Sequence, residues 1–584
     1  MDESLRQAVD GALAEGRYAD ARALLSTASA DPSRDPAMAL RLARACRGDG
    51  AADEALGYAK LAVTAIPADP DIHQLLGDLQ RETQRYPDAL ASYKAVLDTR
   101  PNDPLALRGS ALVAKAMDMA SAAEQLLRIA TAAAPQDGEG WRLLGETELL
   151  QGKVDDGLAS LRRAVAEDPS EANYESLLFH SLLSDHGDAD ERPLLHEFEA
   201  RYGGRLGAAA AFSNTPDPAR PIRVGFLSSA MRTNHNSLYF MAPLLFHHDK
   251  RQTTLHLYGD VDYTRPGEAP LTGLVASACD TTSWDDARIA ERMQRDGIDV
   301  LISALGRGSE APRGRVLRFR AAPVQICFHH VMTTGYRDAD YWIADPLTVP
   351  DTQNEYFSER ILHIPWNFSF VELSDHGPVA PLPAARNGFV TFASTTQIWK
   401  INAAVLDCWR DLLNAVPAAR LKIKALAFKD QTAADWRARC TAHGLPMTRV
   451  ELCPPQTDFW QHMKFYNDVD VILDTFPYGC GNSALEALWM GVPVISLIGR
   501  RFVGRQALSM LSAVGLRDFA VDNKAAYALR AAAAAADIPA LQSLRSSLRD
   551  RMRASPLFDH AGYCRSIETA IRHAWQDWCR GQPG

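Results

Sequence analysis

The segment ASTTQIWKIN, residues 393–402, combines residue types that bind phosphate groups. It follows the apolar run FVTFAS, which predicts a buried strand, and it precedes the helical pattern AAVLDCWRDLLNAV. Gln397 and Lys400 are three residues apart, so one helical turn can direct both side chains to the same point. Helix N-termini favour anions, and a lysine placed there suits a diphosphate. The alternative is a surface lysine whose charged end stays in water, the usual position of lysine.

A second strand-to-helix junction, DTFPYGCGNSALEALWMGVP, carries a glycine loop. Gly479 and Gly481 allow a phosphate to approach the backbone closely. Asn482 or Ser483 is expected to cap the following helix, whose free N–H groups would face an anion. Glu486 lies one turn into that helix, where it could accept hydrogen bonds from sugar hydroxyls. A plain glycine turn with a serine cap is the alternative, but the loop, the cap and the acid together favour a binding site.

Four of the sixteen histidines lie close to predicted strands of the two α/β halves. His235 follows the first strand of the first half, so it is expected to face a cleft, and His462 shortly precedes the strand that leads to the glycine loop. His329 and His330 end the run PVQICF. The alternative for each of them is an ordinary structural or exposed histidine.

Three Asp-x-Asp triplets are candidate metal sites, and they span residues 260–262, 338–340 and 468–470. In some enzymes that use nucleotide sugars, such a pair holds Mg²⁺ or Mn²⁺ on the diphosphate. Here the triplets fall at predicted strand ends and turns, where acidic residues are ordinary charge. The nine cysteines are scattered, without a CxxC pair, which argues against a zinc site or a disulfide framework. We therefore expect no metal ion and no other cofactor.

The elements that would position these residues form two series of alternating strands and helices. Short apolar runs separated by helical patterns are typical of parallel sheets with helices on both faces. The predicted strands are residues 222–230, 253–259, 298–305 and 323–328 in the first series, and residues 389–394, 420–426, 449–454, 469–476 and 491–499 in the second. Ligands of such sheets bind beyond the carboxyl ends of the strands. With two sheets in tandem, the site is expected in the cleft between them.

The first third of the chain repeats every 34 residues. Prolines recur at positions 67, 101, 135 and 169, and alanines recur at positions 21, 55, 89 and 123. This is the period of the tetratricopeptide repeat, in which small residues let two helices approach and a proline ends the second helix. The pairs stack into a superhelix, of about five repeats here, with an extended concave surface. We expect that surface to bind a protein or peptide, and the alternative is a supporting scaffold.

The composition is that of a folded protein without a basic surface. Apolar residues make up 47% and charged residues 23% of the 584 residues, and the formal net charge is −10. Proteins that grip nucleic acid usually carry a basic face, so no nucleic-acid partner is expected. The chain has no run of 18 uncharged apolar residues and no basic-then-apolar leader, so we expect a cytoplasmic protein without a membrane partner. The expected divisions are residues 1–183 for the repeats, 184–220 for linker helices, 221–380 for the first α/β domain, 385–555 for the second α/β domain and 556–584 for a C-terminal helix.

The chain resembles the family of tetratricopeptide-containing O-linked N-acetylglucosamine transferases and SPINDLY-like protein glycosyltransferases, bacterial members included. The resemblance covers nearly the whole chain. Its most specific motifs are QIWKIN, DVILDTFPYG, EALWMGVPVISLIG, SLRDRMRASPLFD and DYWIADPLTVPDTQNEYFSERILHIP. It implies a repeat superhelix followed by a GT-B fold, in which two Rossmann-like α/β domains face each other. It also implies metal-independent transfer with inversion at the sugar.

The resemblance implies roles for individual residues as well. Gln397 and Lys400 match the family's donor-diphosphate glutamine and lysine, and His462 matches a histidine stacked near the nucleotide base. His235 matches an active-site histidine, expected to line the acceptor site, and Glu486 matches a ribose-binding acid. Lys400 and His235 are thus the expected catalytic residues, with Lys400 neutralising the charge that develops on the leaving phosphate.

Two segments depart from the family's pattern. Its diphosphate loop usually reads Gly-His-Thr-Thr or a threonine run, whereas residues 480–483 here read CGNS, which keeps backbone donors and one hydroxyl. Its Gly-Tyr-Pro-type stretch, whose backbone lines the sugar pocket, is replaced by residues 329–332, HHVM. Thr333 and Thr334 follow as expected donor-binding residues, so the threonines are kept and the pocket wall is changed.

The sequence therefore predicts an inverting, metal-independent protein O-glycosyltransferase. It would move a sugar from a UDP-N-acetylglucosamine-like donor to Ser or Thr of a protein held by the repeats. Two added histidines would suit a carboxylate, so one alternative is a flagellin glycosyltransferase with another donor, such as a CMP-nonulosonic acid. A catalytically inactive repeat scaffold is the second alternative, motivated by the altered loop. A lipid or glycan acceptor is the third, and the repeats disfavour it.

Overall fold

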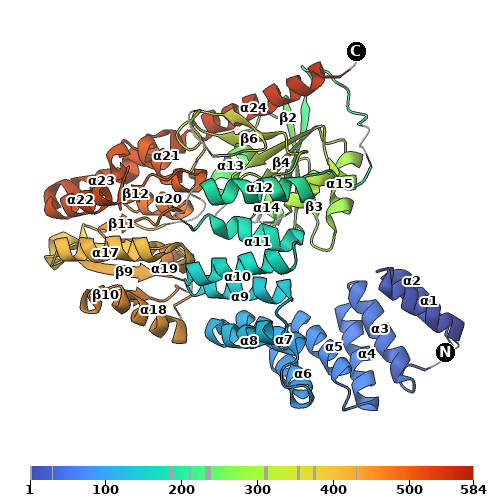
Figure 1. Cartoon of the computed structure of the whole chain (residues 1–584). Helices are drawn as coiled ribbons and strands as arrows, with labels where there is room; N and C mark the ends of the chain where they lie inside the picture. The colour runs from blue at the N-terminus through green and yellow to red at the C-terminus, as the bar shows by residue number, and fades with distance from the viewer. Residues whose placement is uncertain are drawn as a thin grey trace. The chain divides into compact units, whose positions relative to one another are not determined.

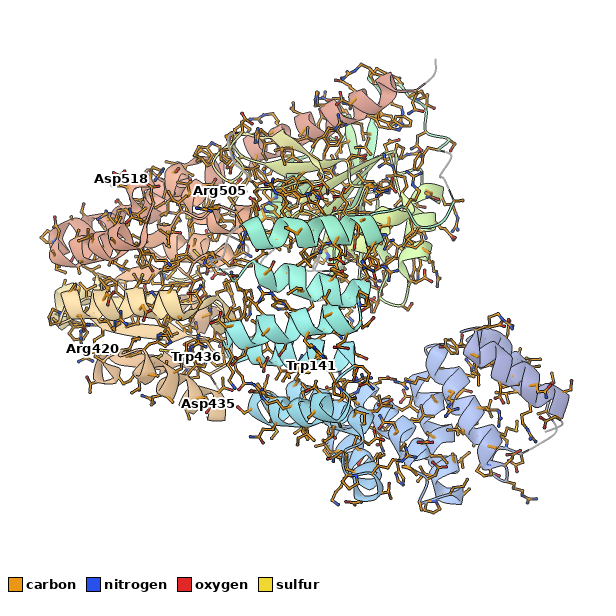
Figure 2. The ribbon with its side chains drawn as sticks, in the orientation of Figure 1. Trp141, Arg420, Asp435, Trp436, Arg505 and Asp518 are labelled. Carbon is orange, nitrogen blue, oxygen red and sulfur yellow. The ribbon has the colours of Figure 1, made fainter. Side chains whose placement is uncertain are left out.

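The computed structural model describes residues 3–28, 31–184, 188–208, 212–229, 238–304, 306–307, 313–351, 355–372, 376–425, 427–428, 430–456 and 458–582. The chain forms two compact units, Met1–Asn173 and Tyr174–Gly584. Their elements are drawn in Figure 1, and the described side chains are added in Figure 2. No helix in the described part of the chain is long and apolar enough to cross a bilayer.

The first unit is a series of helix pairs that follows the 34-residue period. Its helices are α1 (Glu3–Ala14), α2 (Tyr18–Ser26), α3 (Pro36–Gly48), α4 (Ala52–Ala65), α5 (Pro70–Glu82), α6 (Tyr86–Thr99), α7 (Pro104–Ala116), α8 (Ala120–Ala133), α9 (Gly138–Leu150) and α10 (Val154–Glu167). As predicted, α4, α6, α8 and α10 end just before a repeat proline. The partner helices α3, α5 and α7 each begin with a proline that follows a capping aspartate, Asp35, Asp69 or Asp103.

The small residues of the repeat allow the helices to pack closely. The repeat alanines at positions 21, 55, 89 and 123 have no exposed surface. Tyr93 is also fully buried, and its ring fills the space beside Gly77 and Gly109. A Cβ atom on Gly109 would lie 2.4 Å from the Tyr93 ring, a separation that real Cβ atoms do not show. The predicted helical repeats are therefore confirmed.

The second unit contains two parallel sheets. The first has the strand order β3-β2-β1-β4-β5-β6-β7. Its strands are β1 (Ile222–Leu227), β2 (Thr253–Gly259), β3 (Ser277–Asp280), β4 (Val300–Ala304), β5 (Val324–Phe328), β6 (Tyr341–Ala344) and β7 (Arg360–His363), and its helices are α13 (Leu238–His247), α14 (Ala269–Thr272) and α15 (Asp286–Arg295). The four predicted strands of this half are present. The strands β3, β6 and β7 were not predicted.

The second sheet has the strand order β10-β9-β8-β11-β12-β13. Its strands are β8 (Thr391–Ser394), β9 (Arg420–Lys424), β10 (Val450–Cys453), β11 (Val471–Leu473), β12 (Val494–Leu497) and β13 (Ala520–Val521), and its helices are α16 (Pro383–Asn387), α17 (Ala403–Ala415), α18 (Asp430–Ala442), α19 (Phe459–Lys464), α20 (Asn482–Trp489), α21 (Gln506–Ala513), α22 (Lys524–Ala536) and α23 (Ile538–Arg553). The order reverses between β8 and β11, as in doubly wound nucleotide-binding sheets. The crevice at that switch point is the expected ligand site.

Three further helices join this unit. In α11 (Glu171–Ser181), Glu175 forms an ion pair with the buried Arg307. In α12 (Asp188–Tyr202), Glu191 forms an ion pair with Arg501. These contacts place Tyr174 onward in the second unit, whereas we expected the repeats to run to residue 183. The C-terminal helix α24 (His560–Arg580) packs on α13 of the first half. Helices from both ends of the second unit therefore contact its α/β halves.

Candidate functional site

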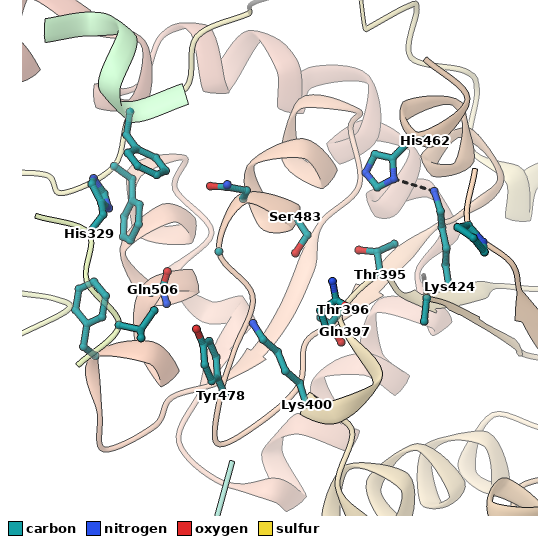
Figure 3. A pocket seen from close by; sticks show the side chains of 18 of the residues that line it. His329, Thr395, Thr396, Gln397, Lys400, Lys424, His462, Tyr478, Ser483 and Gln506 are labelled. Carbon is teal, nitrogen blue, oxygen red and sulfur yellow. Dashed lines mark hydrogen bonds between the residues drawn. The ribbon is translucent and has the colours of Figure 1, made fainter. Parts of the chain in front are cut away.

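A pocket of about 440 Å³ lies along the carboxyl ends of the second sheet. Loops that follow β8, β9, β10, β11 and β12 form one side, so the switch point between β8 and β11 is at its centre. The first α/β half forms the other side with Phe240, His329, Val331 and Phe368 (Figure 3). Ligand pockets typically have volumes of about 300–1,000 Å³. The site thus lies in the predicted cleft between the two sheets.

Gln397 and Lys400 both line this pocket from the loop after β8. They lie in a single 3-10 turn, Ile398–Lys400 with Gln397 as its cap. The helix α17 begins only at Ala403, so these residues are not part of its first turn as expected. The shared direction of the two side chains follows from the short turn instead.

The Lys400 ammonium connects the two loops at the switch point. It donates a hydrogen bond of 2.9 Å to the carbonyl of Gly479, 79 residues further along the chain. Burial lowers the pKa of this ammonium to about 8, while the nearby Asp474 and Cys480 act in the opposite direction. No ion pair between Lys400 and a described residue is present. Its positive charge is therefore available to an anion in the pocket.

The N-terminus of α20 opens into the same pocket. Gly481, Asn482 and Ser483 line it, and the helix begins at Asn482 with Gly481 as its cap. The prediction that Asn482 or Ser483 caps the helix is wrong, because no side chain does so. Among the described groups, no hydrogen bond uses the N–H groups of Asn482 and Ser483. These donors and the positive end of the helix dipole form an anion site beside Lys400.

Asp474, at the end of β11, shapes the glycine loop. Its buried carboxylate accepts hydrogen bonds from the N–H groups of Thr475 and Cys480, both at 2.7 Å, and from the Ser496 hydroxyl at 2.6 Å. Burial raises the pKa of this carboxyl, although the hydrogen bonds act against the shift. The loop is thus held in one conformation, with the Gly479 carbonyl turned toward Lys400. We did not single out Asp474 from the sequence.

His462 lines the pocket near the end of β9. Lys424 donates to its Nδ1 at 2.9 Å (Figure 3), and its Nε2 lies 2.9 Å from a carboxylate oxygen of Glu486. Since an ammonium is only a donor and a carboxylate only an acceptor, the neutral ring carries its proton on Nε2. Burial lowers the pKa of Lys424 to about 8. The chain Lys424–His462–Glu486 fixes the orientation of the imidazole.

Glu486 does not line the pocket, and its role at the ribose stays a prediction. The side chain is only 2% exposed. Besides His462, its carboxylate accepts hydrogen bonds from the hydroxyls of Tyr466 at 3.3 Å and Tyr239 at 3.5 Å. The Glu486 carboxylate orients the His462 imidazole, and its own position is fixed because both of its oxygens have partners.

Thr333 and Thr334 are also absent from the pocket lining, and their donor-binding role stays a prediction. Both hydroxyls donate to the buried carboxylate of Glu359, at 2.7 Å and 2.5 Å, and the N–H of Thr334 does so at 2.8 Å. Their carbonyls accept hydrogen bonds from Arg307. These threonines stabilise the loop behind the pocket wall.

Of the two adjacent histidines, only His329 reaches the pocket. Its backbone is left-handed, with φ +52°, and its ring centroid lies 3.8 Å from that of Phe240. His330 bonds the Ser303 carbonyl instead, with a 3.0 Å contact through Nε2. Burial lowers the pKa of His329 to about 3 and that of His330 to about 4. Both rings are neutral at pH 7, so they provide no cation for a carboxylate. The third histidine of interest, His235, lies outside the described residues.

The three Asp-x-Asp triplets are engaged in contacts within the protein. Asp260 pairs with Arg313 at 2.8 Å, Asp340 pairs with Arg320 at 2.9 Å, and Asp338 pairs with Arg205. Asp470 is fully buried and accepts hydrogen bonds from two backbone N–H groups. In the part of the chain that is described, no group of three or more His, Cys, Asp or Glu side chains converges as a metal site.

Several pocket residues were not predicted from the sequence, among them Lys424, Tyr478, Phe502 and Gln506. Lys424 lies in the predicted strand 420–426, and Tyr478 lies in the motif DVILDTFPYG. The sequence therefore indicates their place in the fold but not the direction in which their side chains point. Phe502 and Gln506 follow β12, where no glycine loop or charge pattern marks a site.

One protein-family model matches both α/β halves that form this site. The model of glycosyl transferase family 41 matches residues 209–381 and 382–567, a span that contains every pocket residue. The chain belongs to glycosyl transferase family 41. Models of tetratricopeptide repeats match residues 12–79, 75–137 and 114–172. The resemblance inferred from the motifs is confirmed.

Individual relatives agree with this assignment. The chain is 32% identical over 381 residues to the protein named probable UDP-N-acetylglucosamine–peptide N-acetylglucosaminyltransferase SPINDLY of Arabidopsis thaliana. The match includes 64% of this chain and 41% of that protein. The SPINDLY protein of Solanum lycopersicum is 32% identical, and that match includes 64% of this chain and 40% of the relative. The chain thus spans about two fifths of these curated relatives. A solved mutant of Thermobaculum terrenum O-GlcNAc transferase superimposes with a TM-score of 0.77 at 28% identity, over 88% of this chain and 98% of that one.

Proposed function

We propose that this protein is an O-glycosyltransferase that takes its sugar from a UDP-N-acetylglucosamine-like donor and transfers it to Ser or Thr of a protein. One observation carries the proposal: the Lys400 ammonium and the free N-terminus of α20 meet at the switch point of the second sheet. Both groups attract a diphosphate. The names of the SPINDLY relatives, which specify this donor and a peptide acceptor, support the choice of donor and acceptor class.

The strand order suggests how the donor lies. With the diphosphate between Lys400 and α20, the nucleoside extends toward Lys424, at the end of β9, and His462, on α19. The sugar then extends the other way, toward His329 of the first half, where the two halves face each other. In this arrangement the sugar lies at the end of the donor that faces the first half, where we expect the acceptor hydroxyl to reach it.

The chemistry follows from these positions. The acceptor hydroxyl forms the new bond at the anomeric carbon while the bond to the diphosphate oxygen breaks, and attack from the opposite face inverts the sugar. Lys400 stabilises the negative charge that develops on the departing diphosphate. The helix N-terminus adds neutral donors to the same oxygens, so the two together take the place of a metal ion. We further propose that the repeats bind the acceptor, as their concave stacking permits.

The carboxylate-bearing donor is less well supported. That alternative depended on two histidines in the pocket wall, but only His329 is there, and burial holds its pKa at about 3. An inactive scaffold is disfavoured because Gln397, Lys400, His462 and the loop at Gly481 converge on one pocket.

Calorimetric titration with UDP, GDP and CMP tests the proposal directly. UDP is expected to bind most tightly, and Lys400→Met is expected to weaken it by roughly tenfold or more, because a charge-assisted bond contributes about 1.5–3 kcal/mol. Lys422→Met is the matched control, since Lys422 is on β9 but outside the pocket and 3.7 Å from Glu451. Tighter binding of CMP, or no nucleotide binding by folded protein, would overturn the proposed donor.

A further inference from the structure

The ammonium of Lys400 lies over the face of the Tyr478 ring. The Lys400 Nζ atom is 3.8 Å from the centroid of the tyrosine ring, and 5.4 Å from that of Trp399. The Tyr478 ring is itself packed edge-on by Trp399 at 5.6 Å and by Phe179 of α11 at 6.5 Å. Thr475 fixes its backbone by donating to the Tyr478 carbonyl at 2.9 Å. Two aromatic neighbours therefore hold the ring in place, and its face is turned to the cation.

This arrangement stabilises a cation without neutralising it. The face of an aromatic ring carries partial negative charge and attracts an ammonium, most strongly where water is excluded. The hydrogen-bond partner of Lys400 is the neighbouring Gly479 carbonyl, so neutral groups surround the charge. A carboxylate in the same place would pair with Lys400 and compete with a diphosphate. An aromatic ring leaves the full positive charge to the ligand.

The tyrosine hydroxyl has a separate function. Tyr478 lines the pocket, and Figure 3 shows its hydroxyl in the space between Lys400 and Gln506. No hydrogen bond from this hydroxyl to a described residue is present, and burial raises the pKa of Tyr478, so the group stays protonated. A neutral O–H at this point can donate to an oxygen of the bound donor beside Lys400.

We propose that Tyr478 acts twice in this site: its ring face positions the cationic Lys400, and its hydroxyl donates to an oxygen of the diphosphate or the sugar. The proposal depends on the function proposed above for Lys400. It makes Tyr478 a positioning residue through its ring and a donor-binding residue through its hydroxyl. The two contributions can be separated, because phenylalanine keeps the ring and leucine removes both.

The test compares Tyr478→Phe and Tyr478→Leu in the full-length protein. UDP release from UDP-N-acetylglucosamine is measured from pH 6.5 to 9.5, and UDP affinity is measured by calorimetry. Tyr478→Phe should keep the wild-type pH profile and weaken donor binding by about threefold to tenfold, the effect of one neutral hydrogen bond. Tyr478→Leu should in addition lower kcat by roughly tenfold or more and move the alkaline limb to lower pH, because the ammonium loses its ring.

Phe179→Leu is the packing control, since Phe179 touches the Tyr478 ring but does not line the pocket. It should reproduce any loss of thermal stability without moving the alkaline limb. An unmoved limb and unchanged kcat in folded Tyr478→Leu would overturn the positioning role, and wild-type donor affinity in Tyr478→Phe would overturn the role of the hydroxyl. If Lys400→Met also kept full activity, the proposed function itself would fail, which is a different result.

Discussion

Replacing Lys400 by methionine removes a charge and keeps most of the side-chain volume. A unit charge about 4 Å from a developing phosphate charge contributes about 4 kcal/mol at the effective dielectric constant of a partly enclosed site. At 1.36 kcal/mol per factor of ten, this predicts a loss in kcat of roughly 10³. Measured losses for single electrostatic contacts in transition states are about 10²–10³, so the two estimates agree.

The pH dependence of kcat/KM distinguishes a lysine that acts as a cation from one that acts as a general base. Burial lowers the pKa of Lys400 to about 8. A lysine that acts as a cation is active while protonated, so kcat/KM should be level below pH 8 and fall above it. A lysine that acts as a general base would give the reverse, a rise through pH 8. Bound diphosphate should hold the ammonium in its charged form, so donor binding near pH 8 should be accompanied by proton uptake.

The assay is UDP release from UDP-N-acetylglucosamine by wild type, Lys400→Met and the control Lys422→Met. Proton uptake is measured by calorimetry in buffers that differ in ionisation enthalpy, and it should decrease in Lys400→Met while Lys424 retains its share. Folding is checked by thermal melting, because Lys400 makes a single hydrogen bond to the β11 loop. A variant that kept more than half of the wild-type kcat, or an activity that rose through pH 8, would refute the electrostatic role.

Four further predictions concern the metal, the pocket wall, the repeats and the helices that follow the repeats. Activity should persist in excess EDTA, because Lys400 and α20 supply the positive charge; loss in chelator that Mg²⁺ or Mn²⁺ restores would contradict this. His329→Gly should relieve the left-handed backbone at φ +52° and widen the wall of the first half; UDP affinity should stay within about twofold while KM for the UDP-sugar changes, and equal changes in both would place the ring at the nucleotide. A chain that begins at Tyr174 should bind UDP normally and lose transfer to the protein acceptor, and unchanged transfer would leave the repeats as a scaffold. A chain that begins at Pro221 should be less stable by about 3–5 kcal/mol for each buried arginine left without its acid, because it lacks Glu175 and Glu191; equal melting temperatures for the two truncated chains would contradict that loss.

Features that depend on neighbouring residues could be read from the sequence. The 34-residue columns, the prolines that end α4, α6, α8 and α10, and the longer strands all express a local period, which needs no knowledge of the fold. The loops at Lys400 and Gly481 were also located correctly, because the topology of a parallel sheet brings all its strand ends to one edge.

The tertiary structure decided which side chains turn into the pocket. His329 and His330 are adjacent in sequence, yet only the first lines the site. Glu486 turns to His462, 24 residues away, and Thr333 turns to Glu359, 26 residues away. Tyr478 meets Lys400 only because β8 and β11 pair in the sheet. Buried polar groups must find partners, and those partners come from distant segments, so the direction of each side chain was settled only when the chain had folded.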